Sequence, residues 1–290
     1  MNEKNRNLAV RVATALLLLP LVLRLLWLGG LPFTLLLSWA AGAAALELNL
    51  FARNDRPGPA AAPGTALPFG NAGALTGSCI ASVVAAFLLP LLTYASVPFV
   101  SAKSVLALLV VVAFTDALFF ETDLARVPSR VGMAILGAVY PGLLISALVR
   151  LRELPSGASW ILLALVVTWF NDTGAYFAGR AFGRRKLYPR ISPSKTVEGA
   201  AGGFVASVGG AVAVKLLFLP QLPWWCAAII GAGGALLGPL GDLSESMLKR
   251  AYGAKDSGNM LPGHGGLLDR IDALLFNAPF VLFCARLFAP

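Results

Sequence analysis

The chain has 290 residues, of which 58% are hydrophobic and 13% charged, and its mean hydropathy is +0.77. A soluble domain cannot bury that much apolar surface, so the composition excludes an ordinary soluble protein and indicates that lipid surrounds most of the chain. The formal net charge of +9 points to cytoplasmic loops and anionic lipid headgroups rather than to nucleic acid.

Long apolar runs without period-two alternation favour helices, because a helix satisfies its own backbone groups inside a bilayer. We therefore expect an all-α, polytopic integral membrane protein with about nine transmembrane helices. The predicted spans are residues 8–28, 31–51, 76–97, 104–120, 130–149, 160–177, 197–219, 223–240 and 267–288. The first run follows a short basic head, but it is too long for a signal peptide and is predicted to be retained. Residues 54–73, rich in Pro and Gly, are predicted to be a linker.

Charged residues gather on one side of this predicted topology. The N-terminus and the loops after the second, fourth, sixth and eighth helices hold most of the Lys and Arg residues, so the positive-inside rule makes that side cytoplasmic. Arg150 and Arg152 fit this count poorly. Cys79, Cys226 and Cys284 lie far apart in apolar stretches and are expected to be small core residues rather than disulfides or metal ligands.

The first polar region, residues 171–199, combines Asp172 with several basic residues. The plain interpretation of those cations is an anchor on anionic lipid. However, Ser192, Ser194 and Thr196 alternate with Pro193 and Lys195 just before a predicted helix. Hydroxyls, a lysine and a helix N-terminus form a candidate phosphate site, although the pattern is not a Walker A sequence.

The second polar region, residues 241–272, is richer in acids. Helical spacing places Asp269 and Asp272 on one face, and likewise Asp242 and Glu245. Carboxylates at membrane depth are functional candidates, with Mg²⁺ as the expected metal, but a buried ion pair with Arg270 or Lys249 is the competing interpretation. Around His264, which is a turn residue or hydrogen-bond donor as readily as a catalyst, Pro and Gly residues shape a tight loop whose N–H groups can approach an anion: Pro262, Gly263, Gly265 and Gly266.

These motifs together resemble a known family. Residues 246–272 carry Ser246-x-x-Lys249-Arg250, Lys255-Asp256, Pro262-Gly263-His264-Gly265-Gly266 and Asp269-Arg270-Ile271-Asp272. This run is similar to the signature of phosphatidate cytidylyltransferases, also called CDP-diacylglycerol synthases. Residues 171–176 and 192–199 also resemble that family, so the likeness covers roughly the last 120 residues.

The resemblance implies a fold, an activity and a set of site residues. It implies that residues 1–150 are N-terminal transmembrane helices and that residues 151–290 form the catalytic transmembrane region. The reaction would transfer the cytidylyl group of CTP to phosphatidic acid in phospholipid biosynthesis. Metal binding would fall on Asp242, Asp269 and Asp272, with Mg²⁺ alone or with a second metal ion. The implied catalytic residues are Asp172, Asp242, Lys249, Arg250 and Asp269, and the implied substrate-binding residues are Ser194, Lys195, Lys255, His264, Gly265, Gly266 and Arg270.

The implied partners are CTP, phosphatidic acid and membrane lipids, in a multi-pass protein of the cell inner membrane whose active site faces the cytoplasm. Two glycine-rich stretches, residues 202–210 and 231–234, permit either packing within the monomer or a homodimer. Two other functions remain open at this point: an archaeal-type CDP-archaeol synthase, and a transporter or channel that uses Glu47, Asp116 and Lys215. The clustering of acids and bases near one face argues against a transporter.

Overall fold

The computed structural model describes residues 3–52, 75–96, 101–261, 263 and 265–288. Its helices are α1 (Glu3–Leu28), α2 (Gly30–Ala52), α3 (Gly77–Ala95), α4 (Ala102–Phe120), the 3₁₀ turn η2 (Leu124–Arg126), α5 (Val127–Ala138), the π turn η3 (Val139–Leu143), α6 (Leu144–Glu153), α7 (Gly157–Phe182), α8 (Val197–Phe218), α9 (Trp224–Ala251) and α10 (Leu268–Phe288). The predicted linker 54–73 lies outside the described residues.

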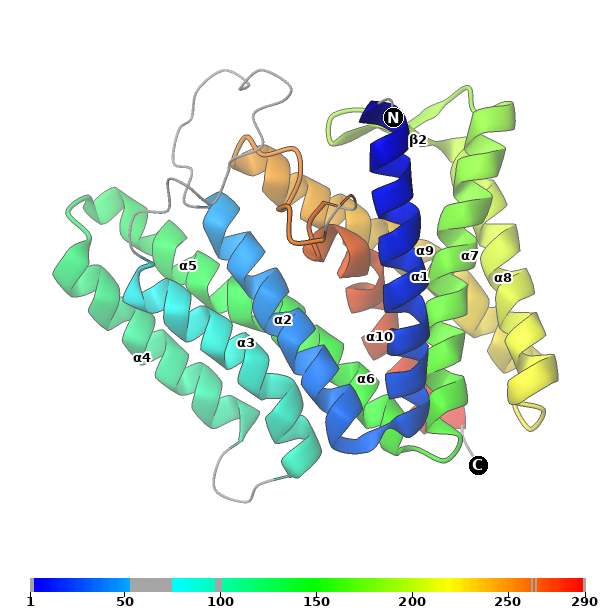
Figure 1. Cartoon of the computed structure of the whole chain (residues 1–290), viewed down its shortest axis with the longest axis horizontal. Coiled ribbons are helices and arrows are strands. Elements are labelled where there is room, and N and C mark those ends of the chain that lie inside the picture. The colour runs from blue at the N-terminus through cyan, green and yellow to red at the C-terminus, as the bar shows by residue number, and fades with distance from the viewer. Residues whose placement is uncertain (1–2, 53–74, 97–100, 262, 264, 289–290) are drawn as a thin grey trace. The chain divides into compact units, whose positions relative to one another are not determined.

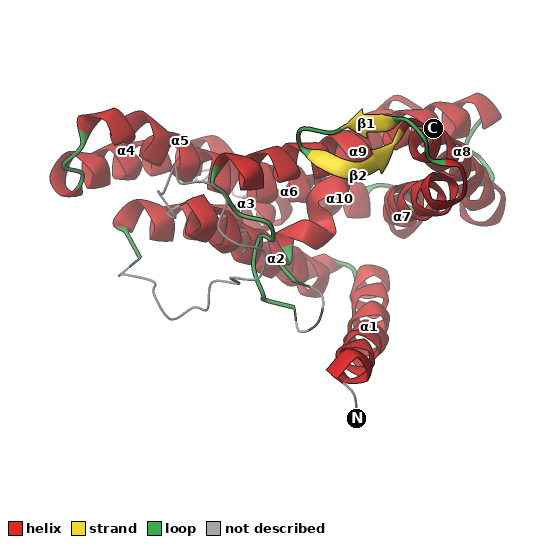
Figure 2. Ribbon diagram, turned by 90° about the horizontal axis from the view of Figure 1, so that it is seen from above, coloured by secondary structure: helices red, strands yellow, loops and turns green. Residues whose placement is uncertain are grey.

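The predicted all-α, multi-pass membrane fold is confirmed. Within the described residues, eight helical stretches are long and apolar enough to cross a membrane. The ninth predicted span corresponds to α1, whose apolar stretch among these residues is Leu16–Leu28. One short antiparallel hairpin, β1 (Lys186–Tyr188) with β2 (Ser192–Thr196), was not predicted. Figure 2 shows these strands in yellow among the red helices.

Two compact units divide the chain, and they do not follow its order. The first contains Met1–Val149 and Ala251–Arg270, and the second contains Arg150–Arg250 and Ile271–Pro290. The segment between α9 and α10 therefore clusters with the N-terminal helices, although the flanking sequence belongs to the second unit.

In the first unit, α2, α3, α4 and α5 pack side by side (Figure 1). A chain of two buried hydrogen bonds crosses this core. Asn49 Nδ2 donates to Ser82 Oγ at 3.1 Å, and Ser82 Oγ donates to the Ala134 carbonyl at 2.7 Å. Gly137 leaves room for these hydrogen-bonded side chains, because an added Cβ would lie 2.6 Å from Ser82 Oγ. Small residues thus let three apolar helices meet around satisfied polar groups.

In the second unit, α7 and α8 lie side by side along their lengths (Figure 1). Gly174 faces the Gly202 carbonyl, to which an added Cβ would approach within 2.7 Å, and Ser207 Oγ donates to the Gly231 carbonyl of α9 at 2.8 Å. An added Cβ at Gly234 would collide with Val167 of α7. The glycine-rich stretches therefore pack within the monomer here.

Two predicted helix limits are corrected. Arg150 and Arg152 lie in the last turn of α6 rather than in a loop, because the helical stretch Leu124–Glu153 continues past the predicted end at residue 149. Arg150 pairs there with Glu153 at 2.9 Å. The predicted span 223–240 is too short, since α9 continues to Ala251. The three cysteines are buried and free, as expected.

Candidate functional site

The basic region after α7 folds into the hairpin and leads into α8. Thr196 is the N-cap of α8, and its hydroxyl oxygen accepts the Gly199 amide at 3.1 Å. Glu198 in the first turn accepts the Arg184 amide at 3.0 Å, which ties the hairpin to the helix. Successive side chains of a strand point to opposite faces, so Ser194 and Lys195 leave β2 on opposite sides. The Thr196 hydroxyl oxygen is occupied by the Gly199 amide, so its role is to cap the N-terminus of α8.

Lys195 of strand β2 reaches a carboxylate on helix α9. Its Nζ lies 2.7 Å from Oδ2 of Asp242, and both side chains are partly exposed. Asp242 lies within α9, beyond the predicted end of that span at residue 240. The helix continues because polar side chains support it at i,i+4 spacing: Ser246 Oγ donates to Asp242 Oδ1 at 3.3 Å, and Lys249 pairs with Glu245 at 2.9 Å.

Three carboxylates from three helices come together in the second unit: Asp172 of α7, Asp242 of α9 and Asp272 of α10. We call them the acidic cluster. Asp242 repels Asp172 and Asp272, and Asp172 also repels Asp272, while Lys195 attracts Asp172 and Lys249 attracts Asp272. Asp172 is exposed, Asp242 is partly exposed and Asp272 is buried. Such repulsion is relieved either by nearby cations or by protonation of a carboxyl group.

Glycine brings two helices of the cluster into backbone contact. An added Cβ at Gly241 would lie 2.5 Å from the Asp272 carbonyl oxygen and 3.2 Å from the Ala273 Cα. Because these atoms belong to the main chain, they cannot turn aside. Gly241 therefore sets how closely Asp242, its neighbour in sequence, approaches Asp272.

Buried amides accompany the acidic cluster. Asn277 Nδ2 donates to Thr168 Oγ1 at 2.8 Å, and Asn171 immediately precedes Asp172. The Oδ1 atoms of Asn171 and Asn277 have no hydrogen-bond partner among the described residues. Gly238 leaves room for both amides, because an added Cβ would lie 3.1 Å from Asn277 Nδ2 and 3.7 Å from Asn171 Nδ2.

The segment between α9 and α10, residues 252–267, carries much of the second predicted motif. We call it the signature loop. Asp269, in the first turn of α10, holds it: Asp269 Oδ2 accepts the Ser257 amide at 3.1 Å and the Gly266 amide at 3.2 Å. Gly265 has a φ of +81°, which favours glycine. His264 and Pro262 lie outside the described residues.

Sequence reasoning missed a role for Glu47, which it considered only as part of an ion path. This carboxylate of α2 is 3% exposed and accepts the Leu267 amide at 2.9 Å, the Leu268 amide at 2.8 Å and the Ser257 hydroxyl at 3.3 Å. A lone acid in an apolar helix was the available signal. Its partners, which are more than 200 residues away in sequence, could not be read from that signal.

The remaining predicted residues differ in exposure. Lys249 is 7% exposed and is paired with Glu245. Arg250, Lys255 and Arg270 are exposed. No group of three or more His, Cys, Asp or Glu residues in the described part of the chain is placed to hold a metal ion. A metal site here would therefore need ligands from substrate or water.

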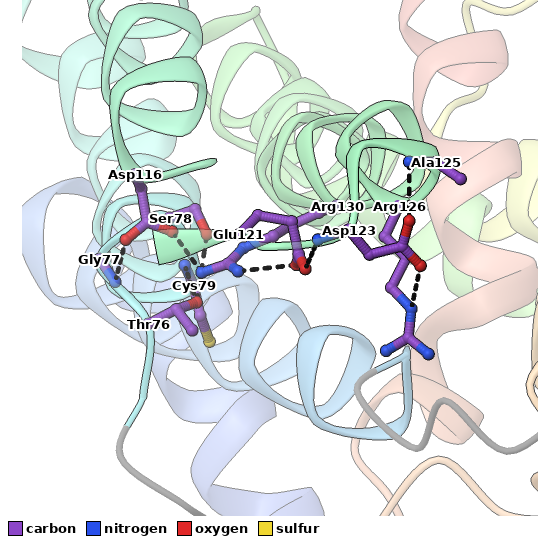
Figure 3. A network of polar contacts seen from close by, with 10 residues as sticks. All are labelled: Thr76, Gly77, Ser78, Cys79, Asp116, Glu121, Asp123, Ala125, Arg126 and Arg130. Carbon is purple, nitrogen blue, oxygen red and sulfur yellow. Dashed lines mark hydrogen bonds and ion pairs between the residues drawn. The ribbon is translucent and has the colours of Figure 1, made fainter. Parts of the chain in front are cut away.

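A separate charged network lies in the first unit (Figure 3). Arg130 contacts Asp116 at 2.8 Å and Glu121 at 3.0 Å, and the Gly77 amide donates to Asp116 at 3.1 Å. A hydrogen bond from the Asp123 amide and, to a smaller extent, one from the Arg130 guanidinium hold the pKa of the Glu121 carboxyl group below its ordinary value. Because opposite charges and amides satisfy one another here, the network joins α3, α4 and α5.

Comparison with known proteins places this architecture in a family. The family model described as "Cytidylyltransferase family" matches residues 9–288. The chain belongs to the cytidylyltransferase family. The chain is 46% identical to the phosphatidate cytidylyltransferase of Bacillus subtilis over 161 residues, which are 55% of this chain and 60% of that protein.

Other relatives of the same name cover similar shares. For the protein of Staphylococcus saprophyticus, the identity is 46% over 125 residues, which are 43% of this chain and 48% of that protein. For the protein of Brucella suis, it is 41% over 160 residues, which are 54% of this chain and 58% of that protein. The matched stretches thus span about half to three fifths of these curated members of the cytidylyltransferase family.

Proposed function

We propose that the chain is a phosphatidate cytidylyltransferase, an enzyme that joins CTP to phosphatidic acid to give CDP-diacylglycerol and pyrophosphate. The observation that carries the proposal is the acidic cluster with Lys195 beside it, in a membrane-spanning member of the cytidylyltransferase family. The name shared by the relatives from three bacterial genera supports the choice of lipid substrate.

In this reaction a phosphate oxygen of phosphatidic acid attacks the α-phosphorus of CTP. The bond from that phosphorus to the oxygen bridging to the β-phosphate breaks, and pyrophosphate leaves with the electron pair. The attacking phosphate is already an anion at neutral pH, so a strong general base is unnecessary. The main difficulty is to align two polyanions, and fixed cations reduce their repulsion. Lys195, a partly exposed cation at the acidic cluster, is placed for that role.

The donor set of the acidic cluster fits a divalent ion. Mg²⁺ prefers hard oxygen ligands, takes one or two protein carboxylates and completes its shell with water and substrate phosphates. We propose Asp242 and Asp272 as its ligands, with Asp172 beside them. When bound, the ion would neutralise phosphate charge and help orient the two substrates. Asp269 belongs to the first unit, and its predicted share in metal binding stays a prediction.

The amphiphilic substrate accounts for a membrane fold around such a site. The acyl chains of phosphatidic acid can stay in the bilayer while its headgroup meets soluble CTP. We propose that this meeting occurs at the cytoplasmic face of the inner membrane, where the positive-inside rule places the hairpin and the signature loop. Exposed cations in and next to these segments, among them Lys255 of the signature loop and Arg270 in the first turn of α10, would then attract the phosphates of CTP.

The test is a turnover assay on the purified full chain in mixed micelles. CTP labelled at its α-phosphate, phosphatidic acid and Mg²⁺ should give label in the lipid phase and one pyrophosphate per labelled lipid, and EDTA should abolish both. Absence of both products in a folded sample would refute the proposal. A preference for an isoprenoid ether phosphatidate would indicate an archaeal-type substrate, and ion flux in proteoliposomes without turnover would indicate a transporter.

A further inference from the structure

We infer that Glu47 is a positioning residue for the signature loop and, through Ser257, for Asp269. The inference rests on the proposed function for its kinetic readout only. All the contacts that carry it lie inside the first unit, which contains both α2 and residues 251–270.

Both Glu47 oxygens are committed to the junction of the signature loop and α10. Oε1 accepts the Leu267 amide at 2.9 Å, and Oε2 accepts the Leu268 amide at 2.8 Å together with the Ser257 hydroxyl at 3.3 Å. The first amides of a helix have no partner within it, and they carry the positive end of the helix dipole. Glu47 thus supplies, from α2, acceptors for two amides at the start of α10.

The charge of Glu47 has no cation among these hydrogen-bond partners, since all three donors are neutral. A carboxylate that is 3% exposed is costly, and removal of one partner from such a site leaves other groups unsatisfied. An amide side chain of the same shape would turn an NH₂ group toward groups that are themselves donors. A carboxylate, which is acceptor-only when ionised, is therefore the group that this junction requires.

Ser257 connects Glu47 to Asp269. The Ser257 hydroxyl donates to Glu47 and also lies 3.4 Å from the Asp269 amide, which donates to it, while the Ser257 amide donates to Asp269 Oδ2 at 3.1 Å. Gly258 and Gly266 permit this close packing, because an added Cβ at either position would lie within 2.9 Å of a Glu47 carboxylate oxygen. A shift of Glu47 therefore moves Ser257, whose amide donates to the Asp269 carboxylate.

The experiment compares Glu47→Gln with Ser257→Ala, their double variant and Asp116→Asn. Asp116 is the matched control, because it is also a buried carboxylate of the first unit but contacts Gly77 and Arg130 instead of the signature loop. Amide hydrogen exchange of a peptide covering residues 257–268 reports the loop, the melting temperature reports folding, and CTP turnover reports the site.

We expect Glu47→Gln to accelerate exchange in that peptide and to lower kcat about 10- to 100-fold, the usual effect of losing a group that orients a site residue. Asp116→Asn should change neither. The double variant should stay within about twofold of Glu47→Gln, because the two residues act in one network.

Unchanged exchange, or a kcat within about twofold of the wild type in a folded Glu47→Gln, would overturn the inference, as would equal losses in Asp116→Asn. If Glu47→Gln does not fold, Ser257→Ala decides on the same two readouts. If the wild type itself does not turn over CTP, the proposed function fails, and the exchange comparison still decides whether Glu47 holds the loop.

Discussion

Asp269 shows what a single carboxylate does in this fold. The sequence left two roles open, a metal ligand or a partner of Arg270, and the structure adds contacts to the Ser257 and Gly266 amides. These contacts need only an acceptor oxygen, which asparagine also has. A change that removes the charge while keeping the acceptor therefore separates holding the loop from metal binding.

We predict that Asp269→Asn keeps the fold and loses Mg²⁺-dependent turnover by about 10²- to 10³-fold, the range for losing one preorganised electrostatic group. Thermal stability in detergent and turnover over a series of Mg²⁺ concentrations measure the two effects. An active variant with a lowered melting temperature would leave Asp269 with a structural role alone.

Lys195 offers a second prediction at this scale. Its ion pair with Asp242 is partly exposed, and such pairs contribute about 0–1 kcal/mol to stability, so Lys195→Ala should melt within a few degrees of the wild type. Its use of CTP should weaken, since a cation beside the acidic cluster is lost. Arg150→Ala, which breaks a partly exposed pair with Glu153 elsewhere, is the control. If the two variants have equal CTP kinetics, Lys195 does not act on CTP, and its role is that of an anchor on anionic lipid.

At the scale of elements, hydropathy located the helices better than it located their ends. The predicted span 197–219 matches α8 closely because the apolar run and the helix begin together after a capping threonine. In α9 the apolar run stops near Leu240, but the helix continues through residues that pair at i,i+4 spacing. Hydropathy reports contact with lipid, whereas helix continuation depends on local hydrogen bonding. The hairpin was missed because Ser-Pro-Ser-Lys-Thr lacks the alternation of a half-buried strand.

The close contact between α9 and α10 at Gly241 predicts how a substitution there changes stability. Gly241→Ala would force the helix backbones apart, so we expect a loss of about 1–3 kcal/mol in stability together with lowered turnover. Gly209→Ala is the matched control in a helix, because an added Cβ there meets nothing within 4 Å. Its melting temperature should be unchanged or higher, as alanine favours helix. Equal melting of the two variants would show that the close contact at Gly241 is not required.

At the scale of the whole molecule, the composition predicted the membrane fold, whereas contacts between distant parts of the sequence could not be predicted. Contacts such as Glu47 with Leu268 join residues of unlike sequence at long separation, and no local pattern encodes them. The motifs that identified the family lie close together in sequence, yet residues 251–270 cluster with the first unit while Asp242 and Asp272 lie in the second.

The topology can be tested directly in cells. Two spans, α8 and α9, separate the hairpin from the signature loop, so both should face the same side, which we predict to be the cytoplasm. Single cysteines at the exposed positions Leu187 and Asn259 should react with an impermeant maleimide only after the membrane is opened. A cysteine at Gln221, between α8 and α9, should react in intact cells. Labelling of Leu187→Cys or Asn259→Cys from outside would reject this orientation.

The burial of Glu47 also constrains how the protein is made. Its partner Leu268 lies 221 residues further along the chain, and at 5–20 residues per second a ribosome needs roughly 10 to 45 seconds to reach it. During that interval α2 is already synthesised, and its carboxylate is without the amides that satisfy it in the finished protein. An ionised carboxylate without partners is costly in lipid. Until α10 is made, Glu47 must therefore stay near water, be protonated, or contact a protein of the insertion machinery. The closing of the signature loop over Glu47 is therefore a late event in biogenesis, and a truncated chain that ends before α10 is expected to be a substrate for membrane proteases.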